Sequence, residues 1–167
     1  MRRLVVAAAL LLTACDASPE AVEPTAVTVG RTSGADAAPV LEPGGLGGVR
    51  LDMTVAQLEA TGEVGGDVTT PEFACPVHEL KAVRGWVGVD GGVAVDIRVE
   101  SGARTPEGLR IGDSRDRMRE VYPDVEQTPH GFVRMADERT RYWFYFRDAG
   151  ETLTGIGLTR EGHGCLN

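Results

Sequence analysis

A repeat with a period of 60 residues most constrains what this chain can fold into. Residues 48–54 read GVRLDMT and residues 108–114 read GLRIGDS, so a glycine, two alternating apolar residues and a final Thr or Ser recur. A Thr or Ser at such a position can cap the N-terminus of a helix. Recurrence at a fixed period indicates a duplicated supersecondary unit. We therefore expect two similar halves, over about residues 48–102 and 108–165.

Each half is predicted to be one helix followed by three strands. The helices are expected over residues 55–60 and 115–121, ended by Gly62 and Pro123. Alternating apolar residues and glycine-rich turns predict strands in both halves, over residues 75–80, 82–89, 93–100, 132–136, 140–146 and 152–159. The predicted fold class is α+β, with the two halves forming one antiparallel sheet and the helices packed on one of its faces.

This arrangement resembles the tandem repeat of β-lactamase-inhibitor proteins. It is also similar to small outer-membrane-assembly lipoproteins, which carry a single copy. The resemblance rests on the motif glycine, apolar, any, apolar, any, any, Thr or Ser, and it covers most of residues 48–165. The chain departs from the motif at Asp52, where glycine is favoured, and at Asp113, where methionine is favoured. The resemblance implies a sheet face that grips a protein partner, and it does not identify that partner.

The N-terminus reads as an export signal. Arg2 and Arg3 precede nine apolar residues, 4–12, a run far shorter than the roughly 20 residues that cross a bilayer. Residues 12–15 (LTAC) resemble the lipobox of bacterial lipoproteins. The resemblance implies that residues 1–14 are removed and that the Cys15 thiol carries diacylglycerol. An ordinary cleaved signal, with Cys15 incidental, is the alternative.

The mature chain is predicted to be a flexible tether followed by one domain. Residues 15–43 are rich in Ala, Pro, Glu and Thr and contain no aromatic residue, which is typical of a segment without a packed core. Residues 44–167 would form the domain. The net charge is −8, and it becomes −10 once Arg2 and Arg3 are removed, so nucleic acid and anionic headgroups are not expected partners. The lipid on Cys15 would therefore supply the membrane affinity and hold the protein outside the cytoplasm.

If the Cys15 thiol carries the lipid, two cysteines are left with free thiols, Cys75 and Cys165. An even pair in an oxidising compartment predicts a disulfide. The alternative is a zinc site, because His78 and His163 lie close to these cysteines in the sequence and would complete a ligand set of two sulfurs and two imidazoles.

The sequence gives little support for catalysis. It contains no nucleophile elbow, no zinc-protease motif and no phosphate-binding glycine-rich loop, so no cofactor is expected. Acidic residues such as Asp90, Asp96 and Glu100 are numerous, and a pair of carboxylates could in principle cleave a glycan. No two of them stand out from the rest.

The strands predict a working face. In residues 141–147 (RYWFYFR) the period of two separates Tyr142, Phe144 and Phe146 from the residues between them. Val93, Val95, Ile97 and Val99 are likewise expected in one apolar row, opposite Asp96, Arg98 and Glu100. Aromatic and arginine residues are enriched at interface hot spots. The predicted partner-binding residues are Arg84, Trp86, Arg141, Trp143, Tyr145 and Arg147.

The resulting hypothesis is a membrane-tethered, non-catalytic module that binds an envelope or secreted protein. The alternatives are a cell-wall-active hydrolase and a purely structural envelope protein.

Overall fold

A computed structural model describes residues 38–147, 150–162 and 165. The predicted signal peptide, Cys15 and most of the predicted tether lie outside these residues. Within them, the chain forms two helices and eleven strands, and the strands belong to two sheets.

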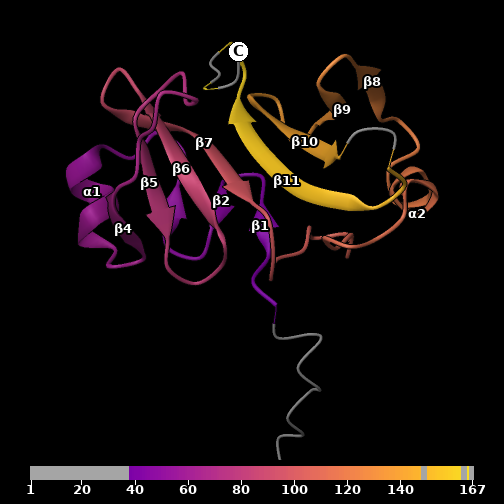
Figure 1. Ribbon diagram of the computed structural model, residues 1–167, viewed down its shortest axis with the longest axis horizontal. Coiled ribbons are helices and arrows are strands. Elements are labelled where there is room, and N and C mark those ends of the chain that lie inside the picture. The colour runs from indigo at the N-terminus through magenta and orange to yellow at the C-terminus, as the bar shows by residue number, and fades with distance from the viewer. Residues whose placement is uncertain (1–37, 148–149, 163–164, 166–167) are drawn as a thin grey trace, which may run out of the picture. The chain divides into compact units, whose positions relative to one another are not determined.

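The larger sheet has eight strands in the order β4-β5-β6-β7-β11-β10-β9-β8, and all neighbours in it are antiparallel. Two sets of four consecutive strands meet at the pair β7 and β11, which lie side by side in the middle of the sheet (Figure 1). The strands are β4 (Val64–Asp67), β5 (Val77–Leu80), β6 (Gly85–Asp90), β7 (Val93–Val99), β8 (Glu126–Thr128), β9 (Gly131–Met135), β10 (Thr140–Phe146) and β11 (Leu153–Arg160).

The two helices begin where the sequence predicts, at α1 (Val55–Ala60) and α2 (Arg115–Val121). The Thr54 side chain accepts a hydrogen bond from the backbone N–H of Gln57, and the Gln57 side chain accepts one from the backbone of Thr54, which completes a capping box. Ser114 caps α2 by accepting from the Arg117 backbone N–H. Neither helix in the described part of the chain is long and apolar enough to span a bilayer.

The smaller sheet consists of β1 (Leu41–Glu42), β2 (Gly45–Leu46) and β3 (Val49–Arg50). Its apolar side chains are buried in the main core, and the Tyr142 hydroxyl donates a hydrogen bond of 2.7 Å to the Leu41 carbonyl. Strand β1 begins three residues before the predicted domain boundary at residue 44. The ordered domain therefore includes part of the segment that was predicted to be tether.

The predicted α+β class, with helices covering one face of the sheet, is wrong. The protein is mostly β, and its helices have six and seven residues and bury one side chain each, Leu58 and Met118. Such short helices cannot cover eight strands, and the small sheet supplies further core side chains. Each predicted half also contributes four strands to the large sheet rather than three. Strands β4 (VGGD) and β8 (EQT) were not predicted, because glycine and short polar runs have low strand propensity.

Candidate functional site

A row of paired residues crosses the middle of the large sheet on the face opposite the main core. Trp86 on β6 pairs with Arg98 on β7, Arg98 pairs with Gly157 on β11, and Gly157 pairs with Trp143 on β10. Directly paired residues of antiparallel strands project to the same side of a sheet. Tyr145, two residues beyond Trp143, lies on this side as well. We call Trp86, Arg98, Trp143 and Tyr145 the aromatic–arginine face.

The Arg98 guanidinium lies between two aromatic rings. Its central carbon is 3.6 Å from the centroid of the Tyr145 ring and 5.3 Å from that of Trp86. Gly157 on β11 leaves room for Tyr145 beside Arg98: a Cβ there would lie 3.2 Å from Tyr145 Cε2 and 3.3 Å from Trp143 Cβ. Cation–π contacts contribute about 0.5–2 kcal/mol, the larger values applying to desolvated cations. The stacking therefore holds the guanidinium in one orientation.

A groove of about 570 Å³ lies beside Tyr145. Its wall includes three arginines and one carboxylate, and the Glu100 carboxylate lies 3.6 Å from the exposed Arg84 in an ion pair. The groove is therefore positively charged locally, although the chain as a whole is acidic. The polar and aromatic residues that line it are Arg84, Arg98, Glu100, Tyr145, Phe146, Arg147 and Thr154.

A buried carboxylate lies next to Arg98 on the same strand. Asp96 is 1% exposed, and neither of its carboxylate oxygens has a hydrogen-bond partner among the described residues. Burial raises the pKa of Asp96 to about 7, and the positive charge of Arg98 partly opposes this. Burial, followed by the charge of Asp96, also raises the pKa of the Tyr145 hydroxyl. Near neutral pH, Asp96 is only partly ionised, so it neutralises only part of the Arg98 charge.

The Cys75–Cys165 disulfide, predicted from the sequence, is present, with its Cα atoms 5.1 Å apart. It packs over Gly88 on β6, where a Cβ would lie 2.6 Å from Cys165 Sγ. The zinc alternative fails for the two sulfurs, because they are bonded to each other. Within the described residues, no group of three or more His, Cys, Asp or Glu side chains could hold a metal ion. His163 lies outside those residues.

One part of the predicted strand pattern is wrong. Val93 and Val95 do not share a row with Ile97 and Val99, because they pack against the disulfide instead of the main core. A bulge between Gly88 and Val89 shifts the pairing of β6 with β7. An extra residue in one strand reverses the alternation beyond it, and a bulge of this kind leaves no mark on the sequence pattern.

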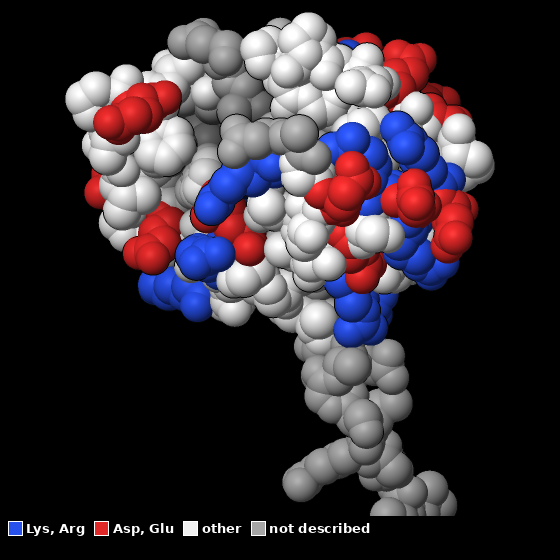
Figure 2. All heavy atoms as spheres, turned by 45° about the vertical axis from the view of Figure 1, so that its right-hand side comes forward, with Lys and Arg blue, Asp and Glu red and all other residues white. Residues whose placement is uncertain are grey.

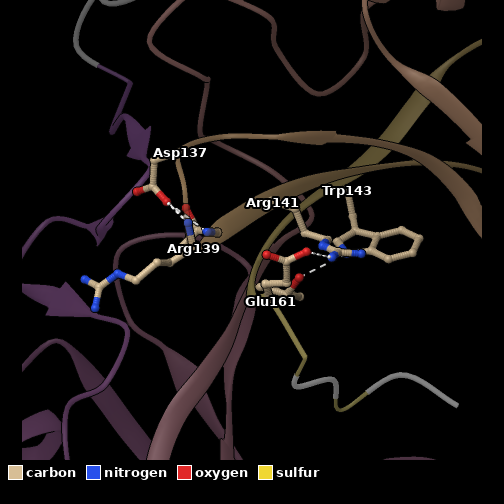
Figure 3. A network of polar contacts seen from close by, with 7 residues as sticks. Asp137, Arg139, Arg141, Trp143 and Glu161 are labelled. Atoms are coloured by element: carbon tan, nitrogen blue, oxygen red, sulfur yellow. Dashed lines mark hydrogen bonds and ion pairs between the residues drawn. The ribbon is translucent and has the colours of Figure 1, made fainter.

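Arg141 and Trp143 are held by partners within the chain, as Figure 3 shows. The Arg141 guanidinium donates a hydrogen bond of 2.7 Å to the Glu161 carboxylate, which also forms an ion pair with it. The Trp143 indole N–H donates to the Thr159 hydroxyl at 3.0 Å. In the turn before β10, Asp137 accepts hydrogen bonds from the backbone N–H groups of Arg139 and Thr140. Glu161 therefore balances the positive charge of Arg141, which was predicted to bind a partner.

The remaining predicted residues lie where a partner could reach them, to different degrees. Arg84 and Arg147 are exposed at the groove, and Trp86 is half-buried because Phe73 packs edge-on against it at 5.2 Å. Tyr145 lines the groove although it is only 8% exposed. Arg98 was not among the predicted binding residues. Its alternation with Asp96 and Glu100 opposite the apolar row was the available signal.

On α2, charged side chains form local pairs. Figure 2, in which the α2 side of Figure 1 comes forward, shows basic and acidic side chains interleaved. The pairs on α2 are Arg117 with Glu120 and Arg119 with Asp116. Exposed pairs of this kind contribute little to stability and leave no net charge. They differ in this respect from the groove, where arginines outnumber the carboxylate.

No family model, curated protein or solved structure matches this chain, so the site is interpreted from its own geometry.

Proposed function

We propose that this protein is a membrane-tethered, extracytoplasmic module that binds another protein through the aromatic–arginine face. The observation that carries the proposal is the Arg98 guanidinium, stacked between Trp86 and Tyr145 at the wall of the groove. Trp, Tyr and Arg are enriched among the residues that dominate binding energy at interfaces. Here these side chains are already packed against one another, so binding would order few of them further.

Binding fits the groove better than glycan hydrolysis. Glycosidases use two carboxylates that flank the scissile bond. Among the described residues that line the groove, Glu100 is the one carboxylate, and it is paired with Arg84. Asp96, whose pKa is raised to about 7, is buried under the disulfide side of the face and is not part of the groove wall. Hydrolysis would need a second acidic group at the wall.

The membrane tether is proposed from the sequence, since Cys15 lies in a lipobox-like segment. A diacylglycerol anchor would hold an acidic domain near a membrane that its own charge does not favour. Cells grown with radiolabelled palmitate should label the wild-type protein and not the Cys15→Ser variant. Equal labelling of both proteins would contradict the anchor.

The binding proposal is tested by affinity with a captured partner. An envelope protein that co-purifies with the full-length protein is purified separately, and its affinity is measured by calorimetry. Replacing the exposed Arg84 and Arg147 by glutamate together should weaken binding at least tenfold, because it reverses the charge of the groove.

The matched control is the charge reversal Arg117→Glu with Arg119→Glu on α2, which changes the net charge equally. This control should change the affinity less than twofold. Equal weakening by both double variants would mean that the partner responds to net charge and not to the groove, and the proposal would fail. Failure of every envelope protein to distinguish the two would favour a structural role.

A further inference from the structure

We propose that the groove beside Tyr145 is a carboxylate-binding subsite anchored by Arg98, and that it takes the acidic side chains of an extended protein segment. This inference rests on the proposed function and adds the chemistry of the partner to it.

The Arg98 side chain is the first feature that favours an acidic ligand. Arginine recognises carboxylates with a planar fork of N–H donors, and stacking on aromatic rings leaves the edge of that fork available. Arg98 is stacked on Tyr145 in this way, and it has no ion pair within 4 Å among the described residues. Its Nε is buried without a hydrogen-bond partner there. Arg98 is half-buried and lines the groove, and the nearby Asp96 carboxylate neutralises only part of its charge, so the guanidinium can still attract an anion there.

The charges at the groove also favour an acidic ligand. Among the described residues that line it, three are arginines (Arg84, Arg98 and Arg147) and one, Glu100, is a carboxylate. The Arg147 side chain is exposed, and no ion pair joins it to another described residue. This local excess of arginine contrasts with the net charge of −8 of the whole chain. The groove is therefore complementary to an acidic segment, while the rest of the domain repels one.

The size of the groove suits an extended segment of a protein. Its volume of about 570 Å³ falls within the range of roughly 300–1,000 Å³ that is typical of ligand pockets. Such a groove holds a few residues of an extended segment and is too small for a folded domain. The Tyr145 backbone carbonyl beside the groove already accepts a hydrogen bond of 3.0 Å from the Thr154 hydroxyl, so it is less available to the backbone of a bound segment. The side chains of the segment would then supply the recognised groups.

The experiment uses defined probes with the mature, unlipidated chain. Acetyl-hexaglutamate amide is titrated while the arginine Nε–H and tryptophan indole signals are followed by NMR. The control probes are acetyl-hexaglutamine amide and inorganic phosphate. We expect hexaglutamate to shift the Arg98 Nε–H and Trp86 indole signals in a saturable manner, hexaglutamine to shift neither, and phosphate to bind at least tenfold more weakly.

Three variants separate the role of Arg98 from general charge. Arg98→Gln should weaken hexaglutamate binding at least tenfold, whereas Arg117→Gln, which removes one charge on α2, should leave it within twofold. Arg98→Lys keeps the charge without the fork and should give an intermediate affinity. Thermal unfolding of each variant shows whether it is folded, and Arg147→Gln at the exposed wall provides a second test, with an expected loss of threefold or more.

The outcomes are distinct from those of the proposed function. Binding of hexaglutamate by the Arg98→Gln variant as tightly as by the wild type, or absence of binding to the wild type, would overturn the carboxylate subsite. Phosphate binding as tight as hexaglutamate would overturn it too, because the site would then select anions of any kind. In each of these cases the face could still bind a partner protein, which the affinity measurements with Arg84 and Arg147 decide separately.

Discussion

The guanidinium carbon of Arg98 lies 3.6 Å from the centroid of the Tyr145 ring. Arg98 is on β7, in the first set of four strands, and Tyr145 is on β10, in the second. Tyr145 also stacks beside Trp143, with centroids 6.3 Å apart and ring planes inclined by 14°. The contact therefore joins the two sets of strands across β11 on the open side of the sheet. It couples the stability of the β7–β11 pair, where the two sets meet, to the arrangement of the proposed binding residues.

Two tyrosines on β10 are expected to respond in opposite ways to loss of the hydroxyl. The Tyr145 hydroxyl is buried without a hydrogen-bond partner in the described structure, whereas that of Tyr142 donates to the Leu41 carbonyl at 2.7 Å. Tyr145→Phe should leave the free energy of unfolding unchanged or raise it. Tyr142→Phe should lower it by about 0.5–1.5 kcal/mol, because it removes a buried hydrogen bond. Urea denaturation measures both, and a larger loss for Tyr145→Phe would contradict these assignments.

Asp96 should make the stability of the domain depend on pH. Its pKa in the folded protein, about 7, is raised above the ordinary value of 3.8. Between these two pH values the folded state binds more protons than the unfolded state, so the free energy of unfolding falls as pH rises. Ionisation of the buried Asp96 should lower the free energy of unfolding by on the order of 4 kcal/mol at most. This destabilisation is fully present above pH 7 and absent below pH 4.

Asp96→Asn removes this ionisation with little change in shape. The stability of the variant relative to the wild type should therefore increase from pH 4 to pH 8, measured by urea denaturation at each pH. Asp124→Asn, at an exposed position, is the control and should show no such trend. A constant difference between Asp96→Asn and the wild type over this range would mean that Asp96 is not held protonated.

Gly88 is expected to be intolerant of a side chain because of the disulfide. A Cβ there would lie 2.6 Å from Cys165 Sγ and 3.2 Å from Asp96 Cβ. Gly88→Ala should therefore lower the free energy of unfolding by about 1–3 kcal/mol, the usual cost of overpacking. Gly66→Ala has nothing within 4 Å of the new methyl group and should be nearly neutral. In a chain with Cys75→Ala and Cys165→Ala, the effect of Gly88→Ala should shrink.

The disulfide itself should be a large contributor to stability. It joins residues 90 positions apart, and a loop of that length restricts the unfolded chain by roughly 3–5 kcal/mol in the entropy model. Replacing Cys75 and Cys165 by alanine together should lower the midpoint of urea denaturation accordingly. A decrease in the free energy of unfolding of less than about 1 kcal/mol would indicate that the unfolded chain is already compact.

The sequence predicted those features that local patterns encode. Caps at Thr54 and Ser114 located both helices, and the alternation in residues 140–146 placed Trp143 and Tyr145 opposite Tyr142 and Phe144. It did not predict how the elements cover one another. The helices contribute less to the core than predicted, because each of them, with six or seven residues, buries a single side chain.

The missed parts of the site depend on contacts between distant residues. Arg98 is a stacked cation because of Tyr145, 47 positions later in the chain, and the charge of Arg141 is paired with that of Glu161. Neither relationship has a period or spacing that could be read from the sequence. The bulge that turns Val95 towards the disulfide is invisible for the same reason.

Photo-crosslinking in intact cells tests the central claim, that the aromatic–arginine face binds a protein partner, most directly. A photoreactive amino acid replaces Arg84 or Arg147 at the groove, or Arg117 or Glu120 on α2, one position at a time in the full-length protein. We expect both groove positions to crosslink to the same envelope or secreted protein and the two α2 positions not to do so. Crosslinking of that protein from α2 and not from the groove would contradict it.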